Sequence, residues 1–207
     1  MAGESQVIGI VGRKGSGKST MLRRVMQRFP RLFLFDAMGE HSWVPNRFHS
    51  MDEAKRFLAW AEVEDEPSFA GSLIPEEDLE AEFCELADLV YEVGGLTFGV
   101  EEVPMLCTPS FLPAQFDRIV RLGRHRGIDL VWTGQRMAEV SRRLTAATDL
   151  FVLFAHTEPL DLDAIADRCG RQVAARVAGL PIHGHLVWDA MGRKVLKGLP
   201  CLPVLVA

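Results

Sequence analysis

A glycine-rich stretch near the amino terminus, residues 12–20, limits the possible folds of this chain more than any other feature. It reads Gly-Arg-Lys-Gly-Ser-Gly-Lys-Ser-Thr and matches G-x-x-x-x-G-K-[ST] at every defined position. An apolar run, residues 7–11, precedes it, and a segment of helical character, residues 21–29, follows it. The motif has its chemical meaning in this order of strand, loop and helix, so a chance glycine turn with a lysine is a poor alternative.

The residue types of this loop fit the task of holding a chain of phosphates. Glycines let several backbone N–H groups point at one phosphate, and the following helix adds unpaired donors and the positive end of its dipole. The Lys18 ammonium can reach the β- and γ-phosphates, and the Ser19 hydroxyl can bind Mg²⁺. We therefore expect ATP with Mg²⁺ to bind through the whole loop: Gly12, Arg13, Lys14, Gly15, Ser16, Gly17, Lys18, Ser19 and Thr20.

Length and composition favour one α/β domain. A chain of 207 residues, 48% of them hydrophobic, can bury one core and hardly two. We expect this core over residues 6–190, with a carboxyl-terminal hairpin strand and tail over 191–207. The net charge of −5 argues against a surface covered with DNA-binding charge, but not against a local basic surface. Four scattered cysteines, with no apolar leader or membrane-spanning run, predict an intracellular chain without a zinc site or disulfide framework.

Continuous apolar runs alternate with amphipathic segments, which predicts a mostly parallel sheet with helices on both faces. The predicted strands are residues 7–11, 31–36, 96–102, 128–133 and 150–155, and the predicted helices are residues 21–29, 50–60, 76–93, 114–126, 141–147, 161–169 and 171–178. Residues 184–198 predict an antiparallel hairpin. Residues 62–75 are acidic and interrupted by prolines and glycine, so we expect a surface loop there.

Polar side chains end two of the predicted strands. Glu101 and Glu102 close the strand at 96–102, and Gln135 follows the strand at 128–133. Strands beside a phosphate loop deliver side chains to the same edge, so we expect Glu101 to hold Mg²⁺, directly or through water, and Glu102 to orient the attacking water. Gln135 would contact the γ-phosphate or its water. The alternative interpretations are that Glu101 and Glu102 are surface residues at a strand end, and that Gln135 is a capping amide.

Arginines crowd the second half of the chain. Those in question are Arg118, Arg121, Arg124, Arg126, Arg136, Arg142 and Arg143. They fit a finger that a neighbouring subunit supplies to the transferring phosphoryl group, a track for nucleic-acid phosphates, or an exposed helix face paired with the acidic segment. The residues alone leave these three interpretations open.

The histidines are weaker candidates. His183 and His185 would share one face of a strand, but no further ligand lies at metal-site spacing, so a surface pair is the better interpretation. His156 and Asp36 lie at predicted strand ends and could touch the site from its edge.

The phosphate loop, the strand end at residues 34–40, the acid pair and the run at 123–136 together resemble the FtsK–HerA superfamily of DNA-pumping ATPases. The resemblance covers residues 6–190 and implies a RecA-like P-loop NTPase fold. It also implies that Arg124 is a finger acting in trans and that Gln135 is a sensor of the γ-phosphate. Most members have aspartate where this chain has Glu101, whose longer side chain would reach the metal through water.

The compact size resembles most the genome-packaging ATPases of membrane-containing icosahedral viruses. That resemblance implies ATP hydrolysis coupled to translocation of double-stranded DNA into a capsid by a hexameric ring of identical subunits. The ring would work in the host cytoplasm or at the packaging vertex, with capsid or portal-vertex proteins as further candidate partners. The alternatives are a filamentous-phage assembly ATPase of the zonula occludens toxin type, a small-molecule P-loop kinase, and a nucleotide-binding protein without turnover.

Overall fold

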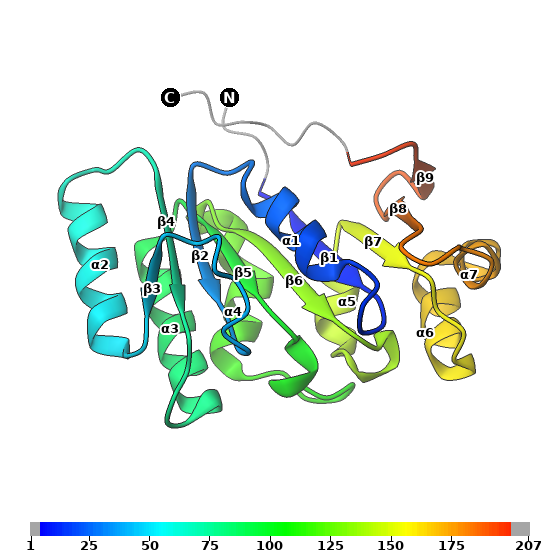
Figure 1. Cartoon of the computed structure of the whole chain (residues 1–207), viewed down its shortest axis with the longest axis horizontal. Helices are drawn as coiled ribbons and strands as arrows, with labels where there is room; N and C mark the ends of the chain where they lie inside the picture. The colour runs from blue at the N-terminus through cyan, green and yellow to red at the C-terminus, as the bar shows by residue number, and fades with distance from the viewer. Residues whose placement is uncertain (1–4, 200–207) are drawn as a thin grey trace.

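The computed structural model describes residues 5–199, and its centre is one nine-stranded sheet (Figure 1). The strands are β1 (Val7–Val11), β2 (Arg31–Phe35), β3 (Asn46–Phe48), β4 (Phe69–Leu73), β5 (Thr97–Val100), β6 (Asp129–Gly134), β7 (Leu150–Phe154), β8 (His185–Asp189) and β9 (Lys194–Leu196). Their order in the sheet is β3-β4-β2-β5-β6-β1-β7-β8-β9. All neighbours from β3 to β7 run parallel, and β8 and β9 add an antiparallel hairpin.

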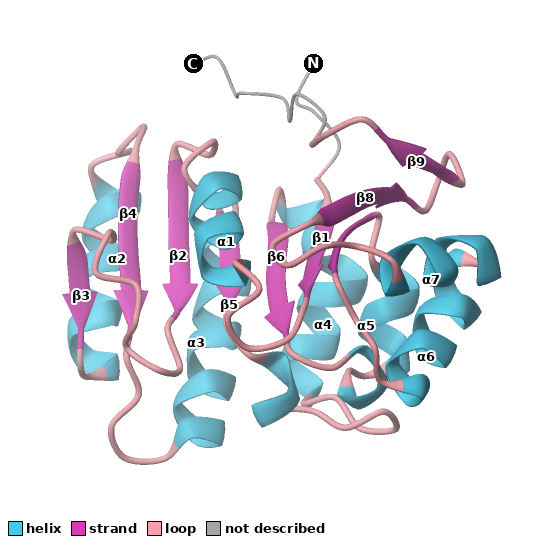
Figure 2. Cartoon of the chain, turned by 45° about the vertical axis from the view of Figure 1, so that its right-hand side comes forward, coloured by secondary structure: helices cyan, strands magenta, loops and turns pink. Residues whose placement is uncertain are grey.

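Helices cover both faces of this sheet (Figure 2). They are α1 (Lys18–Met26), α2 (Met51–Val63), α3 (Leu79–Val93), α4 (Ala114–Leu122), α5 (Arg142–Ala147), α6 (Pro159–Cys169) and α7 (Arg171–Ala178), with short 3-10 turns η1 (Val103–Met105), η2 (Gly123–Arg126) and η3 (Met137–Glu139). On one face α1 packs into an apolar cluster with residues of β1, β2 and β7. On the other face α2, α3, α4 and α5 pack into a larger cluster.

The expected fold class is confirmed, and each predicted strand and helix is present within a few residues of its expected bounds. Continuous apolar runs became the buried parallel strands, because both faces of these strands are covered. The hairpin at the carboxyl end is confirmed as β8 and β9. The predicted tail runs on into residues 200–207, which lie outside the described residues.

The surface loop expected at residues 62–75 is wrong, because this stretch contains β4. β4 pairs with β2 on one side and with the short strand β3, also not predicted, on the other. Gly71 misled the prediction by acting as an apparent strand breaker. In the sheet it provides room, since a Cβ there would lie 2.7 Å from Cε2 of Phe33 and 3.0 Å from Cε1 of Phe57.

The strand order brings several loops to one edge of the sheet. β6 lies between β1 and β5, and β2 lies on the far side of β5. Because these four strands are parallel, the segments that follow them open onto the same carboxyl edge. Over residues 5–199, no helix is long and apolar enough to span a membrane.

Candidate nucleotide-binding site

The phosphate loop joins the end of β1 to the start of α1, and its glycines permit its shape. Gly17, the residue before α1, has φ 105°, in the left-handed region that favours glycine. At Gly12, a Cβ atom would lie 2.5 Å from the Ser16 hydroxyl oxygen and 2.6 Å from the Cβ of Phe154. The Ser16 N–H donates to the Arg13 carbonyl over 3.1 Å and closes the loop on itself.

The start of α1 is open to an anion. No side chain of residues 5–199 caps its first turn, so the unpaired N–H groups and the positive end of the helix dipole are available to phosphate. Ser19 and Thr20 are exposed in this turn, and Arg13 and Lys14 are exposed in the loop.

Lys18 lies over the loop, close to the two predicted acids. Its ammonium donates to the Arg13 carbonyl over 3.3 Å. Partial burial lowers the pKa of Lys18, and the nearby charges of Glu102, Glu101 and Glu40 oppose that shift. The structure therefore brings the loop lysine into the electrostatic field of both predicted acids.

Glu102 has an unusual backbone. Its φ of 49° and ψ of 56° are left-handed, a conformation that costs about 1–3 kcal/mol for a residue other than glycine. Two hydrogen bonds hold it there. The Glu102 N–H donates to the Thr133 hydroxyl over 3.0 Å, and its carboxylate accepts the Gln135 N–H over 3.1 Å. The ends of β5 and β6 are thus joined at the acid that we expect to orient water.

Gln135 lies at the end of β6 with its side chain exposed. Within residues 5–199, the side-chain amide of Gln135 has no hydrogen-bond partner. Only the backbone N–H and carbonyl of Gln135 are bound. Its carbonyl lies 3.2 Å from Nε2 of His156, whose Nδ1 lies 2.9 Å from the Phe154 carbonyl. The fully buried His156, two residues after β7, therefore supports the backbone of Gln135.

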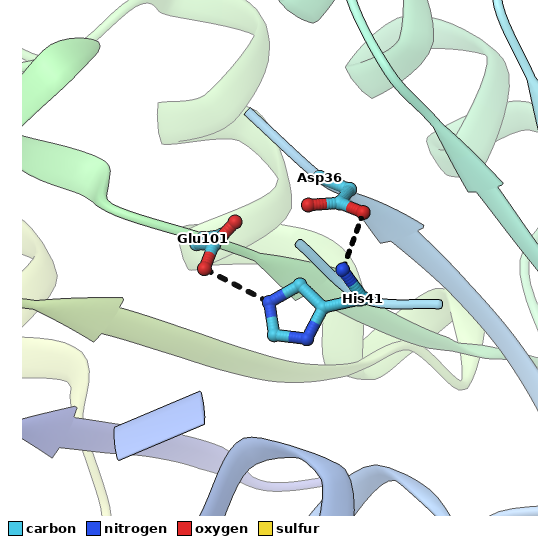
Figure 3. Close-up of side chains that lie close together, drawn as sticks. All are labelled: Asp36, His41 and Glu101. Carbon is cyan, nitrogen blue, oxygen red and sulfur yellow. Dashed lines mark hydrogen bonds and ion pairs between the residues drawn. The ribbon is translucent and has the colours of Figure 1, made fainter. Parts of the chain in front are cut away.

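Glu101 is buried beside Glu102, and its carboxylate meets a histidine that the sequence did not indicate (Figure 3). Its Oε1 lies 2.9 Å from Nε2 of His41, and its Oε2 is buried with no hydrogen-bond partner in the described chain. Burial raises the pKa of Glu101, and the nearby Asp36 carboxylate adds to the rise while His41 opposes it. An unpartnered buried carboxylate oxygen and the exposed Ser19 hydroxyl are oxygen ligands of the kind that Mg²⁺ prefers.

Arg124 lies at the opposite, amino edge of the sheet. It belongs to η2, which precedes β6, and it is exposed. β6 has six residues, so roughly 20 Å of strand separates Arg124 from Gln135 in the same chain. Among residues 5–199 the Arg124 guanidinium has no hydrogen-bond or ion-pair partner, and only its backbone carbonyl is bound, by the Gly127 N–H over 3.2 Å. Its side chain lines a cavity of about 1100 Å³ with Arg121, His125, Asp149, Asp189 and Lys194.

Most other arginines have partners within the chain. The Arg118 guanidinium lies 3.8 Å from the centre of the Tyr91 ring, and Arg126 donates to the Tyr91 carbonyl. Arg121 and Arg143 both approach Asp117, and Arg136 binds Asp161 and Glu139. These partners lie on α3, α4, η3 and α6, so none of these contacts involves the segment at 62–75.

The expected histidine pair on one strand face is wrong. His185 lies in β8, but His183 precedes the strand with φ 64° and lies 3.2 Å from the Ser16 carbonyl. Within the described residues, the one cluster with metal-ligand geometry consists of Asp36, His41 and Glu101.

Comparison with known proteins finds similarity in structure alone. No protein-family model matches the chain, and no curated protein matches it. The genome packaging NTPase B204 from Sulfolobus turreted icosahedral virus 2, solved with ATP-gammaS, superimposes with a TM-score of 0.75 at 18% identity, covering 96% of this chain and 99% of that one.

Two further solved structures share the fold. The DNA-packaging ATPase B204 of Sulfolobus Turreted Icosahedral Virus has a TM-score of 0.72 at 18% identity and covers 95% of this chain and 97% of that one. VirB4 of Thermoanaerobacter pseudethanolicus has a TM-score of 0.61 at 13% identity and covers 91% of this chain and 87% of that one. These likenesses confirm the P-loop NTPase fold expected from the sequence.

Proposed function

We propose that this protein is an ATPase of the FtsK–HerA superfamily that drives double-stranded DNA into a viral capsid. One observation carries the proposal: an intact phosphate loop places Lys18 in the field of Glu101 and Glu102 at one sheet edge. The fold supports it, since the similar packaging NTPase B204 is matched over 99% of its length. The ring would act in the host cytoplasm or at the packaging vertex, where capsid or portal-vertex proteins are candidate partners.

ATP would bind with its β- and γ-phosphates against the loop and the first turn of α1. The backbone N–H groups hold the phosphate oxygens, and Lys18 neutralises charge on them. Ser19 and Glu101 would hold Mg²⁺, which supplies charge neutralisation on the phosphates when bound. Glu102 would accept a proton from the attacking water, a contribution of about 10²–10⁴ in rate. Gln135 would bind that water or the γ-phosphate through its free amide.

Arg124 would complete the site of the next subunit. Its distance from its own phosphate loop excludes it from the site of its own chain. In a closed ring, the amino edge of one subunit faces the loop of its neighbour, and the free guanidinium then meets the transferring phosphoryl group. Release of that contact after hydrolysis would move each subunit along the DNA. We propose a hexamer with the duplex in its centre.

An ATPase assay with and without double-stranded DNA, combined with mass measurement in solution, tests this function. We expect ring-sized assemblies and turnover that duplex DNA stimulates. With a net charge of −5, the duplex must bind to a local basic surface, so affinity should fall by about 10²-fold or more between 50 and 200 mM salt and show little sequence preference.

Other results would exclude a DNA motor. A monomer whose ATPase rate is unchanged by DNA would point to a self-contained enzyme. DNA affinity that does not depend on salt would argue against contacts with the phosphate backbone. The Lys18→Ala variant is the matched control. It should lose turnover under every condition, because Lys18 is the loop residue expected to bring a side-chain charge to the β- and γ-phosphates.

A further inference from the structure

His41 is buried against the predicted metal-binding acid, and a rigid turn holds it there. Its side chain is 2% exposed. The turn follows β2 and is fixed by Asp36, whose two carboxylate oxygens accept the N–H groups of Glu40 and His41, each over 3.0 Å. Asp36 is itself fully buried and bound to β4, because its N–H donates to the Leu73 carbonyl over 2.9 Å. The backbone of His41 is thus fixed before any ligand arrives.

Trp43 fixes the ring of His41. The indole N–H donates to Nδ1 of His41 over 3.1 Å, and the two rings meet edge to face. An indole can only donate, so Nδ1 must be the acceptor and the ring hydrogen lies on Nε2. That nitrogen lies 2.9 Å from Oε1 of Glu101, within ion-pair distance (Figure 3). Each residue therefore presents an N–H group to the next: Trp43 to His41, and His41 to Glu101.

Asp36, His41 and Glu101 could instead be taken for a metal site, since their ligand atoms lie within 4.8 Å of one another. Two observations favour a contact that positions Glu101 over a metal site. Both oxygens of Asp36 already accept backbone N–H groups, and the donation from Trp43 leaves Nε2 of His41 protonated rather than free to bind a cation.

We propose that His41 is a positioning residue for Glu101, and that Trp43 sets the orientation and tautomer of the His41 ring. The proposal rests on the proposed function, because Glu101 is there a ligand for Mg²⁺. His41 holds Oε1, so Oε2, which is buried and has no partner within residues 5–199, becomes the oxygen presented to the site. Groups that orient a metal-binding carboxylate in this way set its geometry and its affinity.

Substitution of His41 gives the first test. We expect His41→Ala to lower kcat and raise the Mg²⁺ concentration for half-maximal turnover, each about 10–100-fold, while the KM for ATP changes by less than about twofold. His41→Gln should recover most of the loss, because its amide can donate to Glu101. Trp43→Phe should shift the Mg²⁺ response in the same direction but less, about 3–10-fold. Trp60→Phe, on the exposed side of α2, is the matched control and should leave it unchanged.

A double-mutant cycle with Glu101→Ala supplies a readout that does not need turnover. In melting temperature, the effect of His41→Ala should shrink strongly in the Glu101→Ala background, because the carboxylate that His41 contacts is already absent. Equal effects in both backgrounds, or an unchanged Mg²⁺ response in His41→Ala, would overturn the positioning role. If the wild-type protein has no ATPase activity, the proposed function fails. The double-mutant cycle still tests the contact between His41 and Glu101.

The metal alternative has its own signature. Calorimetric titration of the nucleotide-free protein with Zn²⁺ or Mn²⁺ should show no stoichiometric binding that depends on His41. One equivalent bound by the wild type, and lost in both His41→Ala and Asp36→Asn, would mean a metal site and would also overturn the proposal.

Discussion

The two edges of the sheet are built differently. At the carboxyl edge the functional side chains are held within the chain: Lys18 by the Arg13 carbonyl, Glu102 by the Gln135 N–H and Glu101 by His41. At the amino edge, Arg124 borders an open cavity of about 1100 Å³, and its guanidinium has no partner among residues 5–199. One edge is organised in the single chain, and the other has a cation available to a second molecule.

The direction of the parallel strands explains this division. Helices that follow parallel strands begin at the carboxyl edge, so their N–H groups and positive dipole ends gather there and attract phosphate. An arginine that precedes a strand is placed at the amino edge instead. Under the proposed function, bringing both kinds of charge to one phosphoryl group would take two copies of the chain, with the amino edge of one against the carboxyl edge of the other.

The strongest test of this division is Arg124→Ala. A finger supplied in trans contributes about 10³–10⁵ to turnover, so the variant should bind ATP almost normally and hydrolyse it very poorly. Mixed with Lys18→Ala, it should regain part of the activity, because an intact finger then meets an intact loop across a subunit boundary. Steady-state ATPase rates and nucleotide binding measure both effects.

Arg118→Ala is the matched control for this experiment, since Arg118 stacks on Tyr91 within its own chain. It should retain most of the turnover. If mixed oligomers of Arg124→Ala and Lys18→Ala form and stay inactive, Arg124 is not the finger, and η2 is better interpreted as a DNA track or a solvated surface.

At the carboxyl edge, Glu102→Gln should lower kcat by about 10²–10⁴ and preserve ATP binding. The amide oxygen can still accept the Gln135 N–H, so the variant loses the base without losing the bond that joins β5 to β6. Single-turnover hydrolysis and nucleotide affinity separate these effects. Glu139→Gln, at an exposed ion pair with Arg136, is the control and should be as active as the wild type. Normal turnover by Glu102→Gln would remove the acid from its proposed role.

Sequence could predict those parts of the carboxyl edge that depend on local patterns. The loop follows from the spacing of Gly12, Gly17, Lys18 and Ser19, and the buried strands follow from continuous apolar runs. The left-handed backbone of Glu102 could not be predicted, because it depends on hydrogen bonds to β6 that form only when the two strands are paired.

The role of His41 beside Glu101 could not be predicted for a similar reason. It lies 60 positions before Glu101 in the chain, and their contact depends on the pairing of β2 with β5. The polar turn after the strand at 31–36 was the available signal, but nothing in it distinguishes a turn histidine from one that supports the site. Strand β4 escaped because Gly71 and Ser72 weaken its apolar pattern, although both are buried between neighbouring strands.

Gly71→Ala tests that account of β4. The added methyl would press on the rings of Phe33 and Phe57, and such overpacking costs about 1–3 kcal/mol of unfolding free energy. Because Leu73 accepts the Asp36 N–H, we expect the damage to reach the turn of His41 before it reaches Arg124. Denaturant unfolding measures the loss. Gly198→Ala, where an added Cβ meets no atom of residues 5–199 within 4 Å, should cost nothing, and an equal cost at both sites would contradict the packing argument.

The smallest expected effect concerns Asp129, at the amino edge. Burial raises the pKa of Asp129 to about 6 from an ordinary value of 3.8, although the N–H of Gln6 donates to its carboxylate and opposes the rise. A carboxyl group whose pKa is higher in the folded state contributes stability below about pH 4, and this contribution is lost as the pH rises to about 6. Above about pH 6 the folded chain has to hold the ionised carboxylate of Asp129 in a partly buried position.

Asp129→Asn removes that charge and keeps an oxygen for the Gln6 N–H. We expect the variant to match the wild type near pH 4 and to be more stable by about 1–2 kcal/mol at pH 8, a figure reduced for the partial exposure of the group. Denaturant unfolding is measured at both pH values. The measurement at pH 4 is the control, because Asp129 of the folded wild type is protonated there and the variant removes no charge. A gain at pH 4 equal to that at pH 8 would show a packing effect. A loss at pH 8 would mean that a cation at the amino edge, within the chain or on a second copy, already stabilises the charged form.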